Sequence, residues 1–321
     1  MKSIKADKRG NRMYYYKIYG FFLESDISFD ELVVAKKQDI DEIDKVVHFH
    51  SGEIDDSIVK VSDYEKEIKT GYMYRFEENR AWIRAVERAC FVIKDGSDIT
   101  YHLYDNCDML AVKEVALCSV MFAILYQKKK IVFHGSGICW NGKTFILSGE
   151  SGAGKSSLAE RFFEMGAQML ADDMVVINQE NDEFFAVPAY PQQKLCLDQV
   201  TDEMKDKYTM ILLPPDNGVF KYGVRIPERF VDEEQKLDAL FIILPSEVSK
   251  TEIEEITGGD KINYLIDNLF QVGIYRKIGL PADRLKKIIA IASNIQVFVI
   301  KRPKIGMTVS EQAELVRSAL V

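Results

Sequence analysis

A run of eight residues, from Gly149 to Ser156, could do specific chemistry. It reads Gly-Glu-Ser-Gly-Ala-Gly-Lys-Ser and matches the phosphate-binding pattern G-x-x-x-x-G-K-[ST]. Glycines let the backbone wrap closely around a polyphosphate, so that its N–H groups point inward. Lys155 would reach the β and γ phosphates, and the Ser156 hydroxyl would bind a magnesium ion. The pattern predicts a nucleoside triphosphate site made by Gly149, Glu150, Ser151, Gly152, Ala153, Gly154, Lys155, Ser156 and Ser157.

Two adjacent carboxylates follow this loop. Asp172 and Asp173 lie seventeen and eighteen residues after Lys155, between the apolar runs of residues 168–171 and 174–177. One carboxylate at the end of a strand beside the loop strand can bind the magnesium ion. The other can accept the proton of an attacking hydroxyl. An Asp-Asp pair is also a common turn signal, but the apolar residues on both sides favour a catalytic pair.

His134 is the third candidate of the site. It lies in the apolar run of residues 131–137, one hairpin before the loop strand, so its ring could approach the phosphates or the metal ion. A single histidine on an apolar strand is more often a structural residue, and only its position favours a functional role. His48 and His50 share one face of another strand, but a metal site there would need a third ligand.

The elements around the loop are arranged as this chemistry requires. Residues 143–148 predict a strand, and residues 157–165 predict a helix that stops at Gly166. Asn141-Gly142 predicts a two-residue hairpin that makes the loop strand antiparallel to residues 131–139. Further strands are expected at residues 168–171, 174–177, 184–187, 239–244 and 297–300, and helices at 260–270, 281–293 and 310–319.

The region before the loop differs in composition. Residues 13–23, 72–76, 89–93 and 99–103 are rich in aromatic and β-branched residues and predict strands. An apolar helix is expected over residues 109–126. We therefore divide the chain into an N-terminal α+β domain, residues 1–108, and a catalytic domain, residues 109–321.

The overall composition limits the classes of function. The chain has 321 residues, 47% of them hydrophobic, with a net charge of −8 and a pI near 5.3, which argues against nucleic-acid binding. The first twelve residues are charged and lack the apolar segment of a signal peptide, and the apolar run of residues 115–126 is too short to cross a bilayer. Five cysteines without a C-x-x-C pair fit a reducing cytoplasm, so we expect a cytoplasmic protein with no membrane contact.

The order of these motifs resembles a known catalytic core. His134-Gly135, the glycine loop and Ala171-Asp172-Asp173 follow one another as in bacterial HPr kinase/phosphorylase, and phosphoenolpyruvate carboxykinase has a related arrangement. The resemblance is close over residues 131–177. It implies an α/β fold with a P-loop kinase core of this type, ATP and Mg²⁺ as cofactors, and a homo-oligomer. It also implies that His134 lies on the phosphate or metal side and that one aspartate is the base. We favour Asp172 as the base and Asp173 as the metal ligand.

Two departures change the expected acceptor. Ser157 stands where the HPr enzymes have a glutamate, and their downstream Arg-Gly-Leu-Gly signature is missing. Residues 187–195 and 16–29 are instead similar to HPr-kinase-like proteins of lasso-peptide biosynthesis, which phosphorylate the C-terminal serine of a precursor peptide. The resemblance therefore implies a serine kinase acting on a peptide or small protein.

A phosphoryl transfer needs positive charge besides Lys155, because the transition state spreads charge over three oxygens. Lys194, Lys221 and Arg225 follow the Asp pair and are candidates, and we expect Arg225 to be catalytic. Two other functions stay open at this point. One is a nucleotide-dependent regulator or assembly factor without phosphotransfer, and the other is a small-molecule or carboxykinase-like enzyme.

Overall fold

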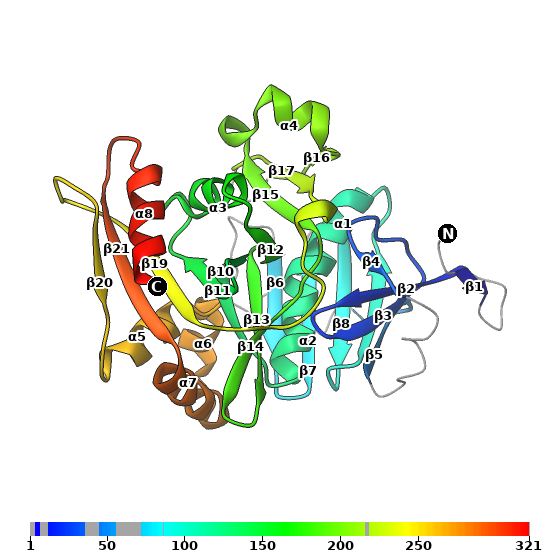
Figure 1. Cartoon of the computed structure of the whole chain (residues 1–321). Coiled ribbons are helices and arrows are strands. Elements are labelled where there is room, and N and C mark those ends of the chain that lie inside the picture. The colour runs from blue at the N-terminus through cyan, green and yellow to red at the C-terminus, as the bar shows by residue number, and fades with distance from the viewer. Residues whose placement is uncertain are drawn as a thin grey trace. The chain divides into compact units, whose positions relative to one another are not determined.

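The computed structural model describes residues 4–6, 12–35, 45–55, 72–85, 87–215 and 218–320 (Figure 1). Most of the charged first twelve residues lies outside this part. The chain forms two compact units, Met1–Lys129 with Cys196–Gly223, and Lys130–Leu195 with Val224–Val321. The apolar helix that we expected to open the catalytic domain groups with the first unit, and so does the excursion Cys196–Gly223.

The first unit is built on a mixed sheet. Its strands follow the order β1-β2-β3-β5-β9-β8-β7-β6, and β4 pairs with β2. Tyr19 and Gly20 have φ values of 50° and 77°, so they turn the chain and divide the expected strand of residues 13–23 into β2 and β3. The strands are β1 (Ile4–Ala6), β2 (Arg12–Ile18), β3 (Phe21–Ser25), β4 (Val33–Val34), β5 (Val46–Ser51), β6 (Tyr72–Phe76), β7 (Arg80–Ala85), β8 (Ala89–Lys94) and β9 (Asp98–Leu103).

One long apolar helix belongs to this unit. It consists of α1 (Met109–Val115), the π-helical turn η4 (Ala116–Val120) and α2 (Met121–Gln127), and the Asp108 carboxylate caps its first turn through Leu110 N at 2.9 Å. Its 19 residues, with a mean hydropathy of 1.9, are long and apolar enough to cross a membrane. The expectation that this apolar segment is too short to cross a bilayer was therefore wrong. The expected burial is confirmed, because 67% of the apolar stretch is buried inside the protein, as in the core helix of a globular domain.

The excursion Cys196–Gly223 carries short elements: η5 (Leu197–Gln199), α4 (Asp202–Lys207) and β16 (Met210–Leu212). It is joined to the rest of the chain through β15 (Gln192–Cys196) and β17 (Lys221–Arg225). The order of the small sheet is β15-β17-β16.

The second unit has a sheet of order β18-β14-β13-β10-β11-β19-β21-β20, and β12 also pairs with β10. β11, β19 and β21 run parallel, whereas β10 and β11 form the expected antiparallel hairpin. Its turn residues Asn141 and Gly142 have φ values of 49° and 73°. The strands are β10 (Ile131–Trp140), β11 (Lys143–Ser148), β12 (Gln168–Ala171), β13 (Met174–Glu180), β14 (Glu183–Val187), β18 (Gln235–Lys236), β19 (Ala239–Ser246), β20 (Glu252–Glu255) and β21 (Gln296–Pro303).

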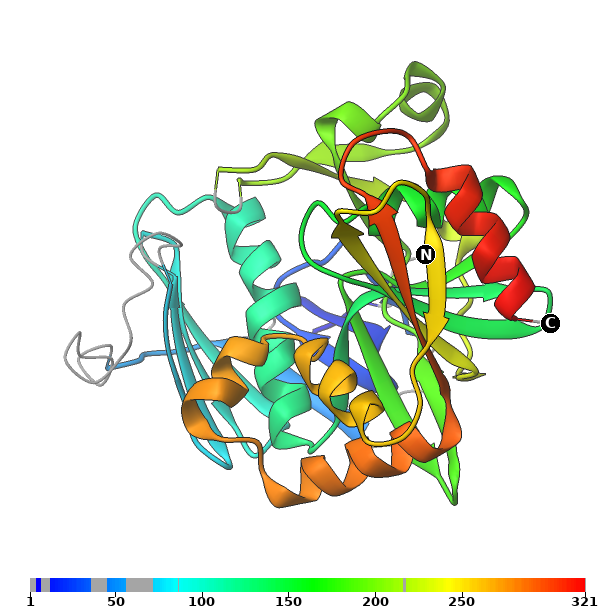
Figure 2. The ribbon, with the colours of Figure 1, turned by 90° about the vertical axis from the view of Figure 1, so that its left-hand side faces the viewer.

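Helices cover this sheet and complete a mixed α/β architecture. α3 packs on β10, β11 and α8, and Figure 2 shows α8, in red, folding back from the end of β21. The helices are α3 (Lys155–Glu164), α5 (Asp260–Asp267), α6 (Val272–Ile278), α7 (Ala282–Asn294) and α8 (Val309–Ala319), with the short turn η6 (Pro227–Arg229). The helices expected at residues 260–270, 281–293 and 310–319 are thus confirmed, with small shifts at their ends.

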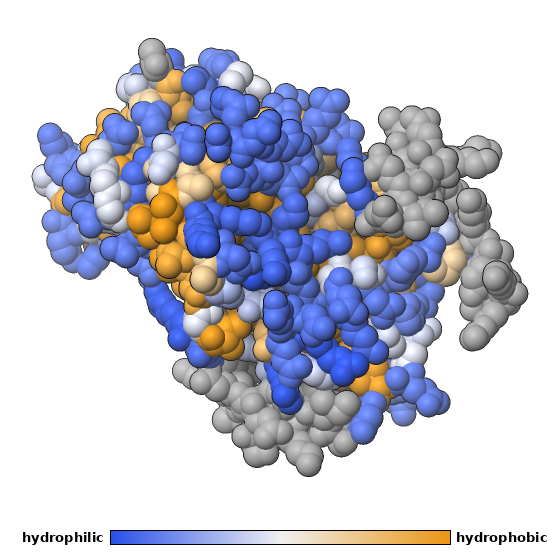
Figure 3. All heavy atoms as spheres, turned by 90° about the horizontal axis from the view of Figure 1, so that it is seen from below, coloured by the Kyte–Doolittle hydropathy of each residue, from blue (hydrophilic) through white to orange (hydrophobic). Residues whose placement is uncertain are grey.

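Aromatic packing ties α3 to the parallel strands. The Phe145 ring of β11 lies 5.0 Å from the Phe162 ring of α3 and 5.6 Å from the Phe241 ring of β19. All three side chains are fully buried. This packing joins the strand that precedes the glycine loop to the helix that follows it. The outside of the molecule is mostly hydrophilic on the face in Figure 3, with a smaller hydrophobic area.

Candidate active site

The glycine loop lies between the predicted strand and the predicted helix, since β11 ends at Ser148 and α3 begins at Lys155. Gly149 has a φ of 141°, and a Cβ atom there would lie 2.6 Å from the Ile243 carbonyl oxygen. Only glycine fits this position without strain. Ser156 and Ser157 follow in the first turn of α3.

Lys155 closes back over the loop. Its ammonium group donates to the carbonyl oxygens of Gly149 at 2.7 Å and Glu150 at 3.1 Å. The side chain therefore lies along the loop rather than in the surrounding solvent. To bind a phosphate group, the ammonium must exchange these carbonyl oxygens for phosphate oxygens.

Asp172 is held from two sides in the turn between β12 and β13. Its Oδ1 accepts a hydrogen bond from Ser136 Oγ at 2.7 Å, and its Oδ2 accepts one from the Lys194 backbone N–H at 2.8 Å. Burial raises the pKa of Asp172, while the hydrogen bonds from Lys194 and Ser136 oppose this rise. The carboxylate is thus fixed in place and protonates more readily than an ordinary aspartate.

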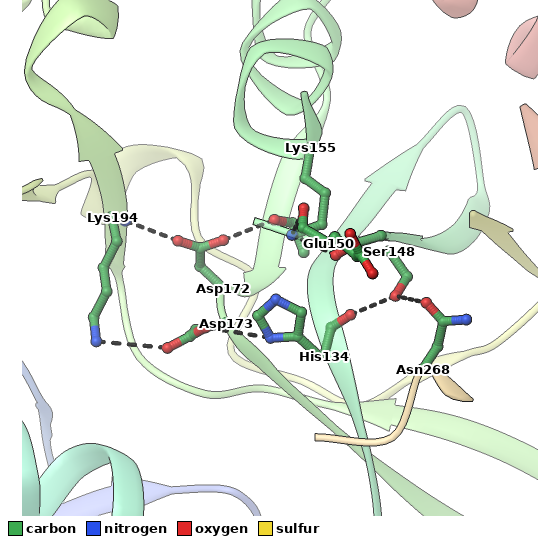
Figure 4. A network of polar contacts seen from close by, with 10 residues as sticks. His134, Ser148, Glu150, Lys155, Asp172, Asp173, Lys194 and Asn268 are labelled. Atoms are coloured by element: carbon green, nitrogen blue, oxygen red, sulfur yellow. Dashed lines mark hydrogen bonds and ion pairs between the residues drawn. The ribbon is translucent and has the colours of Figure 1, made fainter. Parts of the chain in front are cut away.

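Asp173 faces two cationic or titratable side chains. It has a left-handed φ of 70°, so the chain turns between Asp172 and Asp173. Its Oδ1 lies 3.5 Å from His134 Nδ1, and its Oδ2 lies 3.6 Å from Lys194 Nζ. Figure 4 shows His134 between this aspartate and the loop that carries Glu150 and Lys155.

The register of the sheet explains why these residues meet. On one side of β10, Gly135 pairs with Ser148 of the loop strand; on the other, His134 pairs with Met174, just after the Asp pair. The Gly135 N–H also donates to the Asp173 carbonyl at 3.2 Å. Because neighbouring strands are about 4.8 Å apart, the start of the loop and the Asp pair are separated by about 10 Å, with His134 between them.

A buried hydroxyl links the loop strand to the histidine. Ser148 Oγ lies 2.6 Å from the His134 carbonyl oxygen and 2.7 Å from Asn268 Oδ1, so it shares its single proton between two acceptors. The backbone carbonyl oxygen of Asn268, just after α5, also accepts a hydrogen bond from the His134 backbone N–H at 2.9 Å. The His134 backbone is therefore held by contacts from two directions.

The cations differ in their placement. Lys194, one of the three candidates in the sequence, lies beside Asp173 at the site. Arg225 ends β17 and takes part in none of the contacts described above, so its catalytic role stays a prediction. Sequence reasoning missed Arg302, whose guanidinium contacts the glycine loop. Its only sequence signal is its position at the carboxyl end of an apolar strand, where ligands bind in parallel sheets.

Oxygen donors at the site suit a magnesium ion. Mg²⁺ is commonly held by one or two carboxylates together with phosphate oxygens and waters, and Asp173 with the Ser156 hydroxyl fits this set. Within the described residues, no group of three or more His, Cys, Asp or Glu side chains could hold a metal on its own. His48 instead pairs with Glu24 at 2.9 Å, and His50 pairs with Asp98 at 3.1 Å.

Comparisons with known proteins bear on the family of the chain and not on the arrangement of these residues. No family model matches the chain. A protein of Oceanobacillus iheyensis that is named as an HPr kinase/phosphorylase is 26% identical over 151 residues, which cover 40% of this chain and 45% of that relative. The chain thus spans less than half the length of this curated relative.

Among solved structures, the HPr(Ser) kinase/phosphatase from Coxiella burnetii matches 59% of this chain and 95% of its own chain, with 14% identity and a TM-score of 0.31. A TM-score this low does not establish a shared fold. The sequence match is the finding that supports an HPr kinase-like family, because the chain is similar to HPr kinase/phosphorylase over part of its length.

Proposed function

We propose that this chain is an ATP-dependent serine kinase with a P-loop core of the HPr kinase and phosphoenolpyruvate carboxykinase type. The observation that carries the proposal is the arrangement around β10, where a glycine loop with Lys155 lies on one side and two carboxylates lie on the other. The similarity to a protein named as an HPr kinase/phosphorylase supports it. A nucleotide switch would need one metal-binding carboxylate, whereas a kinase uses a second one as a base.

Each residue has a role in this proposal. The loop amides and Lys155 hold the triphosphate, and Ser156 with Asp173 would hold Mg²⁺, which neutralises charge on the phosphate oxygens. Asp172 accepts the proton of the acceptor hydroxyl, because burial raises its pKa and makes it a stronger base than an ordinary aspartate.

The acceptor oxygen then forms a bond to the γ-phosphorus, the bond between this phosphorus and the bridging oxygen breaks, and ADP leaves. Lys194 is the extra cation beside the transferred group. His134, which lies between Asp173 and the loop, keeps the two parts of the site in register.

The acceptor in this proposal is a peptide or small protein with a serine. The C-terminal serine of a lasso-peptide precursor is the first candidate, since residues 187–195 resemble the kinases of that class. HPr and small molecules are the alternatives, because the curated relative carries the name of an HPr enzyme. The proposed setting is the cytoplasm, with a homo-oligomer as the active species.

Mass spectrometry of candidate acceptors after incubation with ATP and Mg²⁺ tests the proposal. The panel contains peptides that end in serine, peptides with an internal serine, and HPr. We expect one class to gain a phosphoryl group, and Lys155→Ala and Asp172→Asn to abolish the gain. Asp182→Asn, in an exposed turn of the same unit, is the matched control and should retain activity. ATP hydrolysis without a phosphorylated acceptor across the panel would favour a regulator instead.

A further inference from the structure

A second cation lies against the glycine loop. Arg302, near the end of β21, donates from Nε to the Ala153 carbonyl oxygen at 2.8 Å. Its Nη1 donates to the Pro303 carbonyl oxygen at 2.8 Å, and its Nη2 makes a longer contact of 3.4 Å to the carbonyl oxygen of Gly152. The guanidinium therefore bridges its own strand end and the loop, which lies 149 residues earlier in the chain.

This contact fixes the orientation of one peptide group. The Ala153 carbonyl and the Gly154 N–H belong to the same planar trans peptide, so they point in opposite directions. When Arg302 holds the carbonyl on one side, the Gly154 N–H must face the other side. Gly154 has a φ of 107°, in the region open to glycine, and its backbone alone would select an orientation only weakly.

The place of Arg302 also fits a nucleotide site. β21 runs parallel to β19, which runs parallel to the loop strand β11, and ligands of such sheets bind beyond the carboxyl ends of the strands. A Cβ atom on Gly154 would lie 3.7 Å from Arg302 Nε, so the guanidinium packs directly on this residue. Arginine keeps its positive charge throughout the physiological pH range and adds that charge to the loop.

We propose that Arg302 is a positioning residue of the triphosphate site: it holds the Ala153–Gly154 peptide so that the Gly154 N–H faces the phosphates. This inference rests on the proposed nucleotide site and assigns a residue to it. Arg302 acts through the loop and does not touch the reacting atoms.

Binding measurements with two probes test how much Arg302 contributes to triphosphate affinity. Affinities for Mg-ATP and for inorganic tripolyphosphate are measured by calorimetry on the full chain. Arg302→Met should weaken both by a similar factor of about tenfold, which corresponds to about 1.4 kcal/mol. Arg302→Lys keeps the charge but loses the fork geometry, so it should recover only part of the affinity. Lys301→Met, which removes the neighbouring surface cation that pairs with Glu254 at 2.9 Å, is the matched control.

The orientation of the peptide has its own readout. Ala153-Gly154 is the one Ala-Gly pair in the sequence, so carbonyl-¹³C alanine with ¹⁵N glycine gives a single NMR signal in a carbonyl-filtered spectrum. Tripolyphosphate should move the Gly154 amide proton signal downfield in the natural sequence. The movement should be smaller in Arg302→Met, even when this variant is saturated with tripolyphosphate. A purely structural role for Arg302 would lower the melting temperature without changing this shift.

Three results would overturn the inference. An unchanged affinity or an unchanged Gly154 shift in Arg302→Met removes the positioning role. Loss of ATP binding with unchanged tripolyphosphate binding assigns Arg302 to the nucleoside instead. Absence of triphosphate binding in the natural sequence, with Lys155→Ala behaving identically, rejects the proposed function itself and the inference with it.

Discussion

Two glycines on the same strand offer a sharp test of how tightly β10 is packed. A Cβ atom on Gly135 would overlap the Leu147 carbonyl oxygen and lie 2.9 Å from Ile146 Cγ2. On Gly137, two residues further, the nearest atom would be Val175 Cγ1 at an ordinary distance of 3.5 Å. The perturbation is the same in chemistry at both positions, Gly→Ala, and differs only in the space available.

The expected magnitudes follow from these distances. Gly135→Ala must move the backbone of β10 or β11, and overpacking of this kind costs about 1–3 kcal/mol of unfolding free energy. Gly137→Ala meets no clash and removes the entropic penalty of glycine in a strand, a gain of about 0.5–1 kcal/mol. We therefore expect the two variants to differ by about 1.5–4 kcal/mol. Gly135→Ala should also lower the proposed kinase activity, because it moves both His134 and Ser148.

Urea unfolding followed by tryptophan fluorescence measures the difference. The chain has two tryptophans, and Trp140 lies on β10 itself, so a Trp82→Phe background reports on the second unit alone. Thermal unfolding in the same background provides an independent check. If Gly135→Ala and Gly137→Ala have unfolding free energies within about 0.5 kcal/mol of each other, the close packing of β10 on β11 is wrong.

Two further predictions concern buried polar contacts. Arg229 lies 3.5 Å from Glu160; burial raises the pKa of Glu160, and this arginine opposes the rise. Arg229→Met should lower the free energy of unfolding by about 2 kcal/mol at pH 8. The loss should shrink as the pH falls through the folded-state pKa of Glu160, because a protonated Glu160 needs no cation. Urea titrations at several pH values check this, and a pH-independent loss would contradict it. Ser148→Ala removes the proton shared by His134 and Asn268 and should cost about 1–3 kcal/mol, whereas Ser148→Ala combined with Asn268→Leu should cost less than the sum of the single changes. Additive costs would show that the serine and the asparagine are not coupled.

Local sequence was enough to predict the parts of the site that are continuous in the chain. The loop, its flanking strand and helix, and the Asn141-Gly142 hairpin depend on short-range rules of backbone geometry, and the structure confirms these elements. The Tyr19-Gly20 turn escaped prediction because tyrosine rarely adopts a positive φ and carries no turn signal.

Contacts between distant segments could not be predicted. Arg302 reaches Ala153 across 149 residues, and the Lys194 N–H reaches Asp172 across 22 residues, because the sheet order brings their strands together. No periodicity or spacing in the sequence encodes that order. The catalytic role of Arg225 stays a prediction that rests on its residue type and on its position after Asp173 in the chain.

The conformation of the Lys155 side chain affects which anions the proposed site can bind. The ammonium is already satisfied by two carbonyl oxygens of its own loop, at 2.7 Å and 3.1 Å. An incoming anion must offer more than these neutral acceptors do, and hydrogen bonds to charged oxygens are roughly twice as strong as those to neutral ones. Chloride or a single carboxylate brings one charge to this exchange, whereas a chain of phosphates brings several charges at once. A triphosphate should therefore displace the two carbonyl oxygens more readily than an anion with one charge.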